Sequence, residues 1–160
     1  YTARSRPSLS VRNNHATLQL QRGQTWWLSM ADWDLGLAGD LPWGLLVSSW
    51  LGNVDVDLRG LALDRAVLAS GMGTVTAVCP DRGSGPIFAR STFGDVRVNV
   101  PEDMAATIIV KAGPFARVRV DSRRYEETGD HRYVTREAES YVQDTLEITV
   151  STVFGTIHVN

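Results

Sequence analysis

A short pattern recurs along this chain at a nearly constant spacing, and it limits the folds that the chain can adopt. Four segments carry a large apolar residue, a glycine and then alternating apolar residues: Leu51–Leu58, Met72–Cys79, Phe93–Val100 and Phe154–Val159. Two weaker copies begin at Met30 and Phe115. The starts at 30, 51, 72, 93, 115 and 154 differ by 21, 21, 21, 22 and 39 residues. Because the last step is close to two periods, we expect one divergent copy between residues 121 and 153.

Within each copy, apolar and polar residues alternate. In the copy that starts at Leu51, Val54 and Val56 fall on one face, and Asp55 between them falls on the other. This period of two predicts a half-buried strand. A second apolar run follows most copies, and turn-forming residues such as those of 80–86 separate the runs. Each period therefore predicts strand, turn, strand, turn.

A fixed period of about 21 residues with short strands is typical of a β-solenoid, in which successive copies stack as parallel rungs. We therefore expect an all-β chain forming one domain over residues 1–160. Regular rungs would occupy 30–120, a charged excursion 121–144 and a terminal rung 145–160. The inward Val, Leu, Ile and Phe side chains would form columns. A sandwich of antiparallel hairpins is the alternative, because evenly spaced strands also suit that fold.

Two stretches carry a resemblance to a known family: FGDVRVNVPED at residues 93–103 and VSTVFGTIHV at residues 150–159. They resemble the C-terminal domain of LiaF-type cell-wall-active-antibiotic response proteins and, more broadly, the toast-rack family, which includes domains described as adhesins. The resemblance covers Leu51–Asn160 well and Ser8–Trp50 loosely. It implies a single-stranded right-handed β-helix, and it offers no catalytic residues.

The same resemblance implies a function. It predicts a non-enzymatic regulatory or scaffolding domain of a bacterial envelope-stress protein that acts through protein–protein contacts. Its partner would be a protein such as a sensor histidine kinase. It also implies membrane association through an N-terminal segment outside this sequence, with the side of the membrane left open.

Composition excludes several classes of protein. Hydrophobic residues make up 43% of the chain and charged residues 21%, which argues against a disordered chain. The longest apolar run, residues 41–51, is too short to span a membrane and contains Pro42 and Gly44. Membrane contact is therefore expected only through segments outside this sequence. A net charge of −2 gives no electrostatic footprint for nucleic acid.

No motif in the sequence indicates a catalytic, cofactor or metal site, so we expect none of these. The single cysteine, Cys79, cannot form an internal disulfide and falls on the inward register. Asn53, Asp55 and Asp57 have the spacing of a calcium loop, but Leu58 stands where its glycine is needed. A β-helix enzyme acting on polysaccharides is a rival hypothesis, which would need acids such as these two aspartates clustered on one face.

All five tryptophans lie within 25 residues, at Trp26, Trp27, Trp33, Trp43 and Trp50. One interpretation is that their rings cover the end of the solenoid, where terminal repeats are atypical. The other is a contact surface for a glycan or a protein, because Trp is enriched in binding hot spots. The second interpretation gives an alternative function, a carbohydrate-binding or adhesive module, with Trp26, Trp27 and Trp43 as candidate contact residues.

The repeat also predicts an outward column of side chains: Asp34, Asp55, Thr76, Arg97 and Arg119. Like charges on neighbouring strands are unfavourable, so Arg97 beside Arg119 suggests a partner-binding surface. The alternative is that exposed charges spread into solvent at little cost. Exposed strands at the ends of a solenoid invite pairing, so end-to-end self-association is a further expectation for this fold.

Overall fold

The computed structural model describes residues 8–12, 15–19, 35–82, 85–136 and 145–160. Contacts divide the chain into two compact units, residues 1–36 and 37–160, and each is described by itself. In the first unit, β1 (Ser8–Arg12) pairs antiparallel with β2 (His15–Gln19). Every regular element in the described residues is a strand, which confirms the all-β prediction.

The first predicted copy, which begins at Met30, is described only at its end. Its residues through Asp34, Trp33 among them, lie outside the described residues. Residues 35–37 are described and belong to no strand. The copies that the structure describes as strands therefore begin with the one at Leu51.

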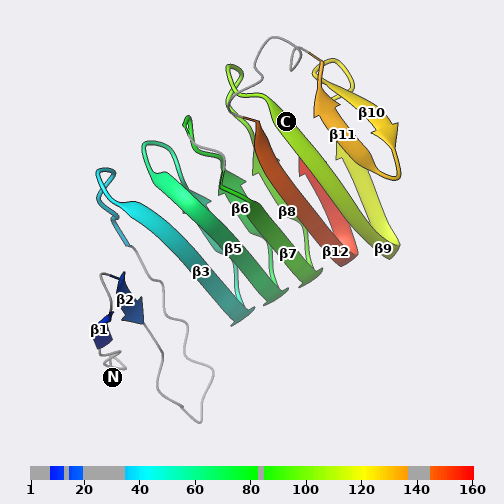
Figure 1. The fold of residues 1–160 in the computed structure, drawn as a ribbon. Helices are drawn as coiled ribbons and strands as arrows, with labels where there is room; N and C mark the ends of the chain where they lie inside the picture. Colours follow the sequence, from blue (N-terminus) through cyan, green and yellow to red (C-terminus); the bar gives the residue numbers. More distant parts are fainter. Residues whose placement is uncertain (1–7, 13–14, 20–34, 83–84, 137–144) are drawn as a thin grey trace. The chain divides into compact units, whose positions relative to one another are not determined.

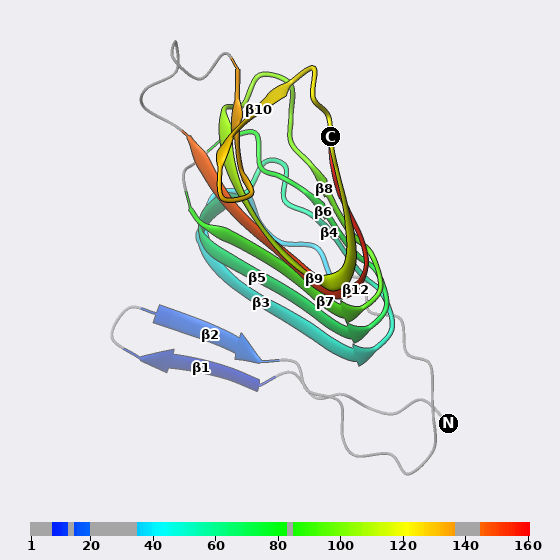
Figure 2. The same ribbon diagram turned by 90° about the vertical axis from the view of Figure 1, so that its right-hand side faces the viewer.

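The second unit is built mainly from parallel strands that lie side by side, with one antiparallel hairpin (Figure 1). Its strands are β3 (Pro42–Leu51), β4 (Val54–Asp57), β5 (Ala62–Met72), β6 (Val75–Val78), β7 (Ile87–Phe93), β8 (Val96–Asn99), β9 (Ala106–Val120), β10 (Tyr125–Gly129), β11 (Arg132–Thr135) and β12 (Leu146–Val159). The long strands β3, β5 and β7 form one row, and the short strands β4, β6 and β8 form another (Figure 2). β12 pairs with β7 through its first half and with β8 through its second half, so it follows both rows around the bend.

The pairing register equals the sequence period. Val54 pairs with Val75, and Val75 pairs with Val96, so each strand partner lies one repeat further along the chain. This confirms the parallel alignment of the copies that the repeat predicted. Equivalent side chains therefore form columns across the strands, and each column has one residue from every paired copy.

The order of the copies in space differs from their order in the sequence. The order of the long strands is β9, β12, β7, β5, β3, so the C-terminal strand lies between β7 and β9. The copies at Phe93 and Phe115 follow each other in sequence, yet the copy at Phe154 separates them. The C-terminal strand β12 thus has a parallel strand on each side.

The predicted divergent copy between residues 121 and 153 is wrong for the described residues of that stretch. β10 and β11 form an antiparallel hairpin, and β11 also pairs antiparallel with β9. The first half of β12 accounts for residues 146–153. The step of 39 residues is therefore one hairpin excursion and a return to the stack. Most described side chains of the excursion are exposed, as its charges suggested.

A β-bulge explains the one irregular step of 22. The register between β12 and β9 shifts between Thr152 and Phe154, where Thr152 pairs with Ala112 and Phe154 pairs with Phe115. β9 thus has one more residue than β12 in this interval. Bulges of this kind add a residue to one strand and bend it locally.

The core lies between the two rows of strands. Its inner columns hold the alternating apolar residues that the sequence indicated, and members of one column are Val54, Val75, Val96 and Ile157. Cys79 is fully buried, as its register predicted. The prediction that Phe side chains join these inner columns is wrong for three of the four phenylalanines. Phe93, Phe115 and Phe154 are 48%, 68% and 39% exposed, because the bend turns them outward.

Each bend combines a glycine with a buried hydroxyl. Gly73, Gly94 and Gly155, which are the repeat glycines of three copies, all have φ of +147°, a conformation that disfavours other residues. The hydroxyls of Ser70, Ser91 and Thr152 donate hydrogen bonds to the carbonyls of Gly52, Gly73 and Gly94, at 2.9, 2.8 and 2.9 Å. Each bend is therefore tied to the bend of the neighbouring copy.

Arg124 fastens the hairpin to the stack. Its guanidinium donates to the carbonyl of Val100 at 2.6 Å, to that of Pro101 and to that of Met104 at 3.3 Å. The adjacent Tyr125 is buried, and its hydroxyl lies 3.4 Å from the carbonyl oxygen of Asn160. The turn before β10 is thus held against the turn before β9.

Candidate binding surfaces

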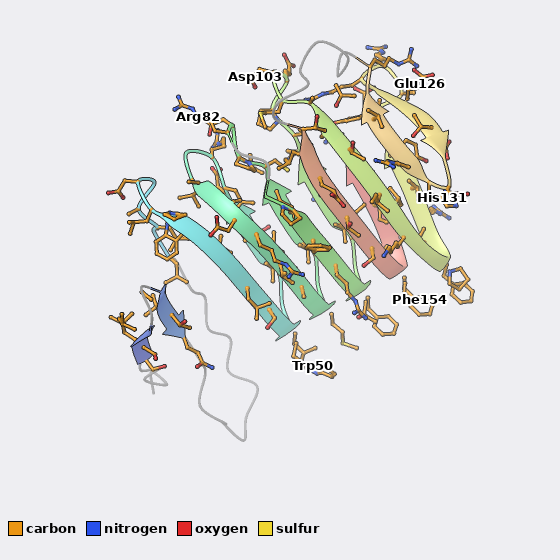
Figure 3. All side chains as sticks on the ribbon, in the orientation of Figure 1. Trp50, Arg82, Asp103, Glu126, His131 and Phe154 are labelled. Carbon is orange, nitrogen blue, oxygen red and sulfur yellow. The ribbon has the colours of Figure 1, made fainter. Side chains whose placement is uncertain are left out.

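An exposed row of apolar side chains follows the bend and is here called the apolar ridge. Its members occupy the same position in five neighbouring strands: Leu51, Met72, Phe93, Phe154 and Phe115. The Phe154 ring stacks on both neighbours, with centroid distances of 4.8 Å to Phe93 and 5.0 Å to Phe115. Figure 3 shows Phe154 and Trp50 projecting at the same edge of the strands. The ridge is a continuous apolar surface that faces solvent.

Sequence reasoning missed the ridge, although a signal for it was present. Each member directly precedes the repeat glycine, except in the weaker copy at Phe115. In the strand that follows, every second side chain points outward. Counting back in steps of two from these outward residues reaches the residue before the glycine. Phe93, for example, is in phase with Asp95 and Arg97.

A charged column lies beside the ridge on the short-strand side. It holds Asp55, Thr76, Arg97, His158 and Arg119 on neighbouring strands. The prediction that Arg97 adjoins Arg119 is wrong, because His158 on the inserted β12 lies between them. Arg97 also forms an ion pair with Asp95, at 3.5 Å. Both arginines are exposed, so the structure places these two predicted contact residues on one face but not side by side.

A second column lies on the long-strand side of the ridge. Its members are Ser48, Ala69, Arg90, Ser151 and Lys111. Arg90 and Lys111 are exposed, and they lie at the end of the stack where the ridge is aromatic. Cations therefore flank the aromatic half of the ridge on both sides.

The outer face of the long strands carries another apolar column, here called the outer-face column. It runs through Leu46, Val67, Phe88, Thr149 and Ile109. Leu46 is 77% exposed, and the guanidinium of Arg65 lies over the Phe88 ring, 4.9 Å from its centroid. Trp50 shares this face on β3 and is 83% exposed. The face is thus apolar mainly at its β3 end.

The predicted tryptophan surface is described only in part. Trp26, Trp27 and Trp33 lie outside the described residues. Trp43 is half-buried against the core, and its indole N–H donates to the carbonyl of Ala38 at 2.7 Å. Trp43 therefore anchors the start of β3, whereas Trp50 presents its ring to solvent.

The ionisable groups with shifted pKa values have structural explanations. Burial raises the pKa of Cys79 to about 12 and that of Tyr125 to about 12. The hydrogen bonds from Arg59 lower the pKa of Asp57 to about 2, and the two side chains form an exposed ion pair. Cys79 is thus a poor nucleophile in the folded chain.

The described residues lack two features that would point to other functions. They contain no group of three or more His, Cys, Asp or Glu side chains arranged to hold a metal ion. They also contain no helix with the length and apolar character needed to cross a membrane.

Comparisons with known proteins show the fold. No family model matches the chain, and no curated protein matches it. The structure is similar to a crystal structure from Clostridium sporogenes that is described as a candidate cell adhesion protein, with a TM-score of 0.78. The similarity covers 98% of this chain and 76% of that one, at 15% sequence identity. This chain thus shares its all-β fold with that protein.

Proposed function

We propose that this chain is a non-enzymatic binding domain of the bacterial cell envelope, built as a single-stranded right-handed β-helix. The parallel pairing of copies one period apart supports the helix. The similarity to a candidate cell adhesion protein supports a binding function, because that protein has the same fold.

The observation that carries this proposal is the apolar end of the outer face. Leu46 and Trp50 are 77% and 83% exposed on one strand. A flat sheet face with an exposed tryptophan suits a protein partner, because large rings supply contact area in the centre of interfaces. Arg65, on the neighbouring strand β5, is exposed beside this end and would form part of the rim.

The finer function follows from the sequence resemblance. We propose that the domain regulates or scaffolds an envelope-stress protein of the LiaF type, with a sensor histidine kinase as partner. Membrane attachment would come from a segment N-terminal to this sequence. The second candidate is adhesion, which the description of the similar structure favours.

A cross-linking capture experiment tests the protein contact. The full-length protein is expressed in its own host, with and without a cell-wall antibiotic, and captured partners are identified. We expect a sensor kinase in an antibiotic-dependent amount, and its loss in the variant Leu46→Ser/Trp50→Ser. The matched control is Leu41→Ser, which also changes an exposed leucine but lies before β3. Capture that is equal in all three proteins would contradict this contact surface.

A retention experiment separates adhesion from regulation. If the domain is an adhesive module that uses its N-terminal tryptophans, Trp26→Ala or Trp27→Ala will abolish retention on cell-wall material without unfolding the chain. If wild-type protein is not retained, the carbohydrate-binding alternative is wrong. Recovery of the protein alone in the capture experiment would instead favour end-to-end self-association.

A further inference from the structure

We propose that the apolar ridge docks this domain on an anionic membrane surface. This contact departs from the expectation that only segments outside this sequence meet a membrane, because it uses an exposed edge of the strands and needs no spanning segment. It concerns the bend of the strands and does not depend on the protein contact proposed for the outer face. It follows from the exposure of the ridge, its position on the outside of the bend and the charges beside it.

The ridge presents apolar groups in a line that can enter a lipid interface. Its five members are between 39% and 68% exposed, and Trp50 precedes Leu51 at one end. The row lies on the outside of the bend, and Figure 3 shows its member Phe154 projecting from the edge of the strands. Apolar tips that project from a polar surface bind the boundary between lipid headgroups and acyl chains. Tryptophan is also enriched at that boundary.

The charges beside the ridge favour an anionic surface. Five cationic side chains lie in the strands that form its aromatic half: Arg90, Lys111, Arg97, Arg117 and Arg119. His158 lies between Arg97 and Arg119. The same strands hold one acid, Glu147 of β12, and Asp95 precedes β8 and is paired with Arg97. Asp55 and Asp57 lie on β4, on the side of Leu51. Cations thus exceed acids around the ridge, although the whole chain has a net charge of −2.

The ring geometry argues against a sugar at Phe154, the middle ring of the three. A sugar binds an aromatic side chain through the face of the ring, because its C–H groups meet the electron-rich face. The interplanar angles of Phe154 with Phe93 and Phe115 are both 5°, so both faces of the Phe154 ring are covered. The ring edges remain free, and they can enter an apolar phase. A projecting ridge also fits a deformable lipid surface better than the flat face of a protein.

Vesicle sedimentation with the full chain tests this proposal. The probes are vesicles of phosphatidylcholine alone and of phosphatidylcholine mixed with phosphatidylglycerol. We expect binding to the mixed vesicles, weaker binding in high salt and little binding to the neutral ones. The variants are Phe115→Ser/Phe154→Ser and Arg97→Gln/Arg119→Gln. Each should weaken binding by about tenfold or more.

Matched controls separate the ridge from general charge and apolar effects. Arg123→Gln/Arg132→Gln removes two exposed arginines from the hairpin region, and Leu46→Ser removes an exposed leucine from the outer face. Both should bind mixed vesicles like the wild type. Circular dichroism shows whether each variant is folded, and the arginine pair tests the proposal even if the phenylalanine pair unfolds the chain.

Several outcomes would overturn the proposal. One is failure of the folded wild type to bind mixed vesicles. Another is an equal loss of vesicle binding in Arg97→Gln/Arg119→Gln and in its control, Arg123→Gln/Arg132→Gln. The wild type could fail to bind vesicles while the ridge variants no longer capture a protein that the wild type captures. The ridge would then be a protein contact. Loss of capture in Leu46→Ser/Trp50→Ser, with normal vesicle binding by Leu46→Ser alone, would leave the lipid proposal standing and support both surfaces.

Discussion

Phe154 stacks on Phe93 with 4.8 Å between ring centroids, although the hairpin of β10 and β11 lies between them in the chain. The contact exists because β12 returns to the stack and pairs with β7. On its other side, Phe154 stacks on Phe115 of β9. The C-terminal strand thus joins two parts of the ridge that the chain order would separate.

A double-mutant cycle measures the ring contact. We expect Phe93→Leu and Phe154→Leu to show a coupling free energy of about 0.5–1.5 kcal/mol, because stacked aromatic pairs contribute beyond their buried area. Chemical denaturation of the four proteins gives the value. Phe93→Leu with Phe115→Leu is the control cycle and should be additive, since Phe154 separates these rings. An equal coupling free energy in both cycles would show that ring stacking does not cause the coupling.

The bend glycines should not tolerate a side chain. Gly94 has φ of +147°, and a Cβ there would collide with the carbonyl oxygen of Gly73. We expect Gly94→Ala to lower the free energy of unfolding by about 2–3 kcal/mol. Gly44→Ala is the control, because no atom lies within 4 Å of its Cβ position. A Gly94→Ala protein as stable as Gly44→Ala would contradict the bend geometry.

The hydrogen bonds from the hydroxyls of Ser70, Ser91 and Thr152 at the bends should contribute measurably to the free energy of unfolding. Ser91→Ala removes the donor that bonds the carbonyl of Gly73 at 2.8 Å in a buried site. We expect a loss of about 1–2 kcal/mol in the free energy of unfolding. Ser151→Ala, on the outer side of β12, should change it by less than about 0.5 kcal/mol. Thermal unfolding of both variants makes the comparison, and the prediction fails if their losses are equal.

Alkaline pH should destabilise the fold through Cys79. Burial raises its pKa from 9.0 to about 12, so above pH 9 the unfolded chain binds fewer protons than the folded chain. This contribution is fully present below pH 9 and is lost toward pH 12, at up to about 1.4 kcal/mol per pH unit. Denaturation midpoints across this range should fall more steeply for the wild type than for Cys79→Ala. Tyr125 remains in both proteins and adds the same slope to each, so parallel curves would exclude the Cys79 contribution.

Much of the fold followed from local pattern. The period of 21 residues predicted the pairing of Val54 with Val75 and of Val75 with Val96, and alternation predicted that Cys79 is buried. A glycine recurs before each short strand, and Gly73 and Gly94 have the positive φ that suits this residue. Each of these features follows from a pattern that can be read along the chain, namely the repeat spacing, the alternation or the recurring glycine.

The candidate surfaces needed the tertiary structure. Nothing in the spacing indicated that His158 separates Arg97 from Arg119, or that Phe154 lies between Phe93 and Phe115. The physical reason is that copies with matching alternation can pair with one another in any order. The sequence by itself determined which residues face inward and where the chain bends. Only the tertiary structure decided the order of the strands, because that order depends on which edge the returning strand β12 can pair with after the hairpin.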